Sequence, residues 1–150
     1  MGLMDEPGEA GTRTRRRKVP LHPTLVTVPI GCWVMSPVLD IVGMAKNSPG
    51  EFTTASTWLL GIGLLTAVLA GVVGLADALP IPPRTAAYRQ AMIHLSLALV
   101  AVLLYGVNYL MRTATPGGPV PVGLLVFSLI NLVVLLTTAR VGAALAYRHR

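Results

Sequence analysis

The chain of 150 residues is 53% hydrophobic, only 12% of its residues are charged, and its formal net charge is +6. An ordinary soluble domain is about 45–50% apolar and about 25% charged. The composition excludes a disordered chain, and it argues against a water-soluble enzyme because so few charges cannot cover a folded surface. Cys32 is the only cysteine, which excludes an internal disulfide framework.

Four long uncharged stretches follow one another along the chain. They cover residues 19–39, 52–76, 90–111 and 113–139. A hydrocarbon core of about 30 Å requires about 20 mostly apolar residues in a helix. Backbone groups inside a membrane must be paired within their own segment, so each stretch is expected to be helical. The sequence therefore predicts an all-α integral membrane protein with spans near 22–45, 54–78, 87–111 and 121–147.

The connections between these spans favour an up-down four-helix bundle. They are short and rich in proline and glycine, which mark the places where helices stop. Short connections make neighbouring helices antiparallel. We expect one transmembrane domain over residues 21–150, preceded by a basic, polar tail over residues 1–20.

The lysines and arginines predict the orientation of the bundle. Only Lys46 and Arg112 fall on one side, and the other ten fall on the side that holds both termini. The positive-inside rule then places both termini in the cytoplasm, in a multi-pass protein of the inner (cytoplasmic) membrane. Because the basic run of the tail adjoins the first span, we expect it to contact anionic lipid and not nucleic acid.

Small residues recur every four positions in the second span. They are Gly63, Ala67 and Gly71, with Gly74 close by. Such spacing lets helix backbones approach closely. We favour packing within the bundle, because the second span already has neighbours there, and a dimerisation face of a homo-oligomer is the alternative.

Polar residues take matching positions in the first and third spans. His22 and Asp40 are 18 residues apart, and so are His94 and Arg112. Eighteen residues make five whole helical turns, so each pair shares one helix face. Because the two spans run in the same direction, His22 is able to meet His94 and Asp40 to meet Arg112. Polar groups inside a membrane are functional candidates.

The two pairs suggest different roles. We expect a structural contact between Asp40 and Arg112, with Asn108 near it. Two neutral imidazoles from separate membrane helices suit the axial positions of a b-type haem, so His22 and His94 are candidate ligands.

Other roles remain open for the two histidines. His22 stands at a helix start, and His94 has Asp77 as an alternative partner. Three arginines, Arg84, Arg89 and Arg140, are expected on the same side as structural partners, haem-propionate contacts or lipid-headgroup contacts.

The functional hypotheses are therefore three. Common hydrolase, nucleotide-binding and thiol-redox motifs are absent from the sequence, so we do not expect an enzyme. The leading hypothesis is a redox or electron-transfer accessory with a haem and a redox-protein partner. The alternatives are a structural or interaction subunit without a cofactor, and an oligomeric transporter or channel lined by Asp40, Asn108 and Asn131.

Residues 20–147 resemble a bacterial family of four-span membrane proteins known as domain of unknown function 2231. The matching residues are His22-Pro23, Pro29-Ile30-Gly31, Asp40, Gly74-Leu75-Ala76-Asp77, Arg89 and His94. Many members have a second histidine where this chain has Thr27-Val28, so that histidine is missing here. Some relatives are joined to Rieske-type or cytochrome-like domains, which implies electron transfer, but the family has no assigned reaction.

Overall fold

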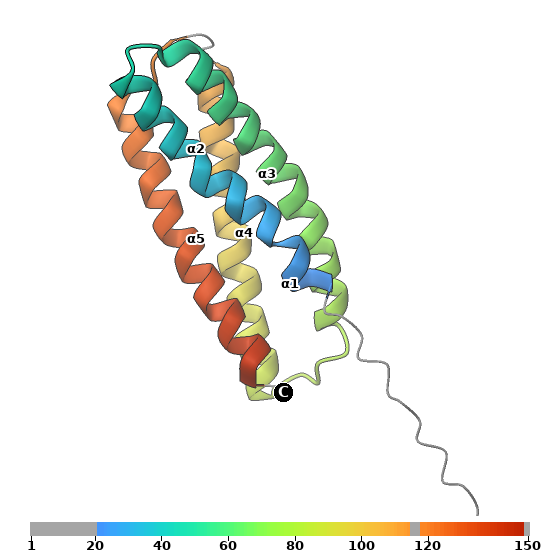
Figure 1. Cartoon of the computed structure of the whole chain (residues 1–150). Coiled ribbons are helices and arrows are strands. Elements are labelled where there is room, and N and C mark those ends of the chain that lie inside the picture. The colour runs from blue at the N-terminus through green and yellow to red at the C-terminus, as the bar shows by residue number, and fades with distance from the viewer. Residues whose placement is uncertain (1–20, 115–117, 149–150) are drawn as a thin grey trace, which may run out of the picture.

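The computed structural model describes residues 21–114 and 118–148, so the tail expected over residues 1–20 lies outside the described residues. The described residues form helices and connections, without a strand. In chain order the helices are α1 (Leu21–Leu25), α2 (Thr27–Ala45), α3 (Pro49–Ala78), α4 (Ala86–Thr113) and α5 (Val122–Arg148) (Figure 1).

The predicted all-α four-span architecture is confirmed. Four helical segments are long and apolar enough to cross a membrane, with α1 and α2 together forming the first. Figure 1 shows them as an up-down bundle. Leu21, Arg148 and the α3–α4 connection lie at one end, here called the terminal end. The α2–α3 and α4–α5 connections lie at the other, here called the hairpin end.

Two helix boundaries differ from the prediction. The third helical element, α3, begins at Pro49 and not near residue 54, because a proline in the first turn and the acidic Glu51 both suit a helix start. The first span is divided between α1 and α2 at Val26. Pro29 has no N–H to bond the carbonyl of Leu25, which weakens the helix at this point.

Many large apolar side chains lie on the outside of the bundle, while several polar side chains are buried inside it. Leu65, Leu103 and Val133 are each at least 60% exposed, whereas Asn108 and Asn131 are fully buried. Hydrocarbon chains solvate apolar side chains, while polar groups must find partners within the protein. This distribution is the one expected of a protein surrounded by lipid.

The bundle consists of two helical hairpins. The helices α2 and α3 pack closely along their length, as do α4 and α5, and the packing between the hairpins is less extensive. Gly63 contributes to the first hairpin, because a Cβ at this position would overlap the indole ring of Trp33. The helices α2 and α4 lie diagonally across the bundle, so their longer side chains make the contacts between them.

Candidate functional site

Three pairs of side chains connect the first span with α4 through the centre of the bundle. They are His22 with His94, Trp33 with Tyr105, and Asp40 with Arg112, in order from the terminal end to the hairpin end. The two members of each pair are 72 residues apart in the chain. The polar faces of the first and third spans therefore meet along the bundle axis.

The pair at the hairpin end belongs to a buried group that we call the arginine cluster: Asp40, Ser56, Asn108, Arg112 and Ser128. The Nη1 and Nη2 atoms of Arg112 donate to Oδ1 and Oδ2 of Asp40 at 2.9 and 2.6 Å. Its Nε donates to Oδ1 of Asn108 at 2.9 Å. The remaining hydrogens reach the hydroxyls of Ser56 and Ser128, both at 3.1 Å. All five N–H groups of the guanidinium are thus used.

Every transmembrane segment contributes to the arginine cluster. Asp40 comes from α2, Ser56 from α3, Asn108 from α4 and Ser128 from α5. Further bonds join the cluster, because Asn108 donates to Ser128 at 2.9 Å and the hydroxyls of Ser36 and Ser56 lie 2.8 Å apart. A buried ion pair is stable only when such bonds satisfy its remaining donors and acceptors. This arrangement suits holding four helices together, since it leaves the guanidinium no donor for a ligand.

A cavity of about 280 Å³ occupies the terminal half of the bundle and is partly open to the outside. We call it the histidine cavity. All five helices border it, and many of the bordering residues are alanine or glycine. Its walls include His22, Trp33, Ala70, His94, Ala101 and Thr138.

The two histidines of this cavity have matching hydrogen bonds. Nδ1 of His22 lies 2.8 Å from the carbonyl oxygen of Ala70, and Nδ1 of His94 lies 3.2 Å from that of Thr138. A carbonyl oxygen can only accept, so Nδ1 carries the proton in both rings. In a neutral imidazole, Nε2 then keeps its lone pair. This is the tautomer in which a histidine binds a metal through Nε2 while its other nitrogen is held by a carbonyl.

The two imidazole rings lie close together at the border of the cavity. Their centroids are 6.3 Å apart and their planes are nearly perpendicular, at 80°. No third histidine, cysteine or acidic side chain joins them in a group among the described residues. The site is thus a pair of nitrogen donors in an otherwise apolar chamber.

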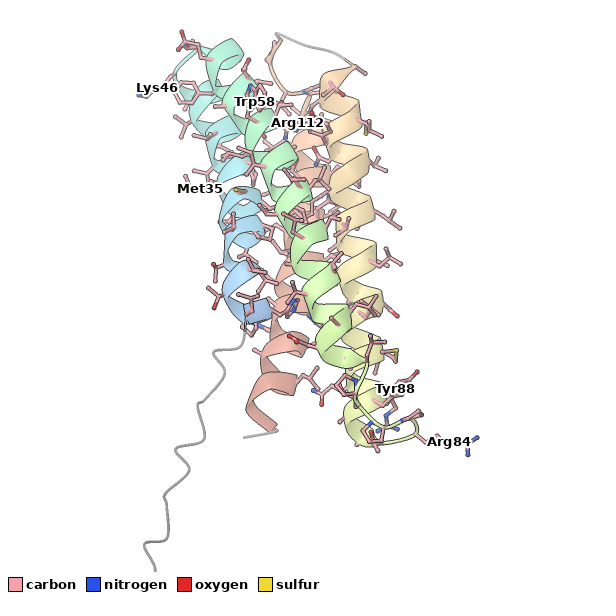
Figure 2. All side chains as sticks on the ribbon, turned by 90° about the vertical axis from the view of Figure 1, so that its right-hand side faces the viewer. Met35, Lys46, Trp58, Arg84, Tyr88 and Arg112 are labelled. Atoms are coloured by element: carbon pink, nitrogen blue, oxygen red, sulfur yellow. The ribbon has the colours of Figure 1, made fainter. Side chains whose placement is uncertain are left out.

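The other candidate residues of the terminal end lie outside the cavity. Asp77, Arg84, Arg89 and Arg140 are exposed, and none of them borders it. Figure 2 shows Arg84 directed away from the bundle. The expected alternative contact of His94 with Asp77 is not seen among the described residues, since Nδ1 of His94 is bonded to the backbone of α5 and Asp77 is exposed on α3.

The polar residues considered for a transport path do not border the cavity either. Asp40 and Asn108 are held in the arginine cluster, which lies inside the bundle near the hairpin end, where Figure 2 labels Arg112. Asn131 is buried and donates to the carbonyl of Leu104 at 3.3 Å.

The small residues of the second span have several inward contacts. Gly63 lies against Trp33, Ala67 and Gly71 border the histidine cavity, and Gly74 lies against the ring of His22. These contacts support packing within the bundle. Association with a second copy stays a prediction.

The sequence matches a family model described as predicted membrane protein (DUF2231) over residues 18–150. The match covers most of the chain, so this protein belongs to that family. No curated protein and no solved structure matches the chain.

Proposed function

We propose that this membrane protein is a redox accessory that binds one b-type haem between His22 and His94. The supporting observation is the geometry of the two rings, whose centroids are 6.3 Å apart. Imidazole nitrogens bind first-row metals at about 2.0–2.1 Å, and a ring nitrogen lies about 1.1 Å from its centroid. Two imidazoles on opposite sides of one metal ion therefore have centroids about 6.3 Å apart. The centroid spacing of His22 and His94 would therefore admit one metal ion held by both rings.

The chemistry of the two donors also suits haem iron. Both Nδ1 atoms are bonded to backbone carbonyls, so both Nε2 atoms keep a lone pair. Haem supplies one-electron chemistry when bound, and its axial ligands set its potential. His22 and His94 would both hold the iron, which would leave no ligand position for a reacting molecule. Such a site favours electron transfer over enzymatic turnover.

The walls of the histidine cavity are compatible with a flat ligand. Small residues such as Ala70, Gly71, Ala98 and Ala101 leave space between the helices, and Trp33 closes the side nearest the hairpin end. The volume of about 280 Å³ is at the low end for a ligand site, so a haem must extend through the open side. The mostly apolar walls would limit the access of water to a bound haem.

The proposed location is the inner membrane, with both termini in the cytoplasm. The distribution of lysine and arginine supports this orientation. The histidine cavity would then lie toward the cytoplasm, where the tail meets anionic lipid and a redox-protein partner would exchange electrons. Reporter fusions after residue 150 and in the α4–α5 connection test the orientation: the first should be active only as a cytoplasmic reporter and the second only as a periplasmic one.

The competing proposal is a structural or interaction subunit without a cofactor. The complete hydrogen bonding of Arg112 supports it, because a cluster of this kind holds helices without any ligand. It assigns no role to the free nitrogens of His22 and His94, which is why we favour haem.

Absorption spectroscopy decides between these proposals. The full chain is produced with a haem precursor, purified in detergent, and measured oxidised and dithionite-reduced. We expect the sharp reduced bands of a six-coordinate b-type haem, lost in His22→Ala and in His94→Ala. His149→Ala is the control, since it removes the remaining histidine of the chain and should leave the bands unchanged. A featureless spectrum at full protein yield, or bands that persist in both single variants, would contradict the proposal.

A further inference from the structure

The two histidines are held by the same arrangement, repeated once in each hairpin. His22 bonds to the carbonyl of Ala70 on α3, and its ring lies against Gly74, one helical turn further along α3. His94 bonds to the carbonyl of Thr138 on α5, and its ring lies against Gly142, again one turn further on. In both hairpins the first span supplies the ring and the second supplies the carbonyl and the glycine.

Contacts elsewhere in the bundle also recur between the hairpins, but at an interval of 72 residues, whereas the two carbonyls and the two glycines are each 68 residues apart. Ser36 contacts Ser56 across an interval of 20 residues, and Asn108 contacts Ser128 across the same interval. Together with the three central pairs, which are 72 residues apart, these contacts relate one hairpin to the other. A ligand held by both histidines would therefore lie between two similar halves, in which the registers of the supporting helices α3 and α5 differ by about one helical turn.

We infer that Gly74 and Gly142 are equivalent positioning residues, which set the orientation of the two imidazoles toward a shared metal-porphyrin ligand. The inference rests on the proposed function for the identity of that ligand. The effect of the two glycines on the imidazole rings is independent of the proposed function.

The distances to the imidazole atoms show that neither Gly74 nor Gly142 has room for a side chain. A Cβ at Gly74 would lie 2.7 Å from both Cε1 and Nδ1 of His22. A Cβ at Gly142 would lie 2.6 Å from Cε1 and 3.0 Å from Nδ1 of His94. These approaches are closer than van der Waals contact, so each ring would have to move. Such a movement would disturb its bond to the carbonyl one turn away, and this bond favours the tautomer that leaves Nε2 with its lone pair.

At these two positions the glycine accommodates a side-chain ring, as Gly63 accommodates the indole of Trp33, and the ring here is a candidate ligand. Glycines in membrane helices commonly let two backbones approach each other. At Gly43, accordingly, a Cβ would meet the side chain of Phe52 and the backbone of Pro49. At Gly74 and Gly142 the three nearest atoms all belong to an imidazole. The space at each position is therefore occupied by the histidine.

The test compares four single variants of the full chain in detergent. Gly74→Ala and Gly142→Ala are the test variants. Gly106→Ala and Gly123→Ala are matched controls in α4 and α5, because a Cβ at either position meets nothing within 4 Å. Nitrogen NMR of ¹⁵N-histidine-labelled protein without haem reports the tautomer of each ring, and the reduced-minus-oxidised spectrum reports haem binding.

We expect each test variant to change one ring only. Gly74→Ala should alter the His22 signals and spare those of His94, and Gly142→Ala should do the reverse. Both should weaken haem binding by about 10- to 100-fold, the usual effect of disturbing the groups that orient a metal ligand. The controls should behave as the wild type in both measurements.

A double variant keeps the test decisive if a glycine variant folds poorly. Removing the ring removes the overlap, so Gly74→Ala should lower the melting temperature of the wild type and leave that of His22→Ala unchanged. Unchanged imidazole signals and unchanged haem spectra in both test variants, or equal destabilisation in both backgrounds, would overturn the inference. Altered imidazole signals in a protein whose wild type binds no haem would refute the proposed function and leave the role of the glycines in place.

Discussion

The two ends of the bundle use equivalent positions of the same helices in different ways. At the hairpin end, Arg112 and Asp40 satisfy each other, and the cluster around them uses every donor of the guanidinium. At the terminal end, His22 and His94 each bond one ring nitrogen to a backbone carbonyl, and both residues border a cavity. Polar groups inside a membrane protein therefore indicate a binding site only when a donor or acceptor stays free and space adjoins it.

A stacked aromatic pair separates the two ends. The rings of Trp33 and Tyr105 lie 4.0 Å apart at an angle of 9°. Trp33 forms part of the cavity wall, and the buried Tyr105 lies behind it. The pair isolates the ion pair from the cavity, so changes at one end should have limited effects at the other.

The largest effect is expected from the substitution Asp40→Asn. It leaves the buried guanidinium of Arg112 without its counter-charge, and breaking a buried pair in this way costs about 3–5 kcal/mol. Denaturant unfolding in detergent measures the loss of stability. Asp77→Asn is the control, because Asp77 is an exposed acid of the same protein.

A second comparison sharpens this prediction. Replacing both partners, as in Asp40→Leu with Arg112→Leu, should recover much of the lost stability, because no charge then stays buried. If Asp40→Asn unfolds at the same denaturant concentration as Asp77→Asn, the arginine cluster does not hold the bundle together.

A smaller effect is expected from Ser128→Ala. The hydroxyl of Ser128 accepts from both Arg112 and Asn108, and hydrogen bonds to charged groups contribute about 1.5–3 kcal/mol. Thr137→Ala is the matched control on α5, since its exposed hydroxyl bonds to Val133 of its own helix. Equal stability of the two variants would show that the cluster does not depend on its serines.

The smallest effect, and the opposite sign, is expected from Tyr105→Phe. The phenolic oxygen of Tyr105 is buried and has no hydrogen-bond partner among the described residues. Removing an unsatisfied buried group is neutral or stabilising, by up to about 1 kcal/mol. A loss of stability in the same unfolding experiment would mean that the hydroxyl has a partner, such as an ordered water.

The sequence predicts the four spans and the contact of Asp40 with Arg112, because both depend on spacing along a helix.

The sequence does not reveal the roles of Ser56 and Ser128, because serines in helices usually bond to their own helix and carry no sign of a distant partner. The carbonyls of Ala70 and Thr138 are also hidden, since a backbone acceptor exists at every residue. The sequence also does not indicate which face of its helix Asp77 occupies, and the structure places it in an exposed position.

The most direct test of the difference between the two ends is the melting temperature with and without haemin. It is measured for the wild type and for the His22→Ala/His94→Ala double variant. Binding at 100 times the dissociation constant stabilises a protein by about 2.7 kcal/mol. The account predicts that haemin raises the melting temperature of the wild type only, and that the two proteins melt at similar temperatures without haemin. An equal rise in both proteins, or none in the wild type, would contradict it.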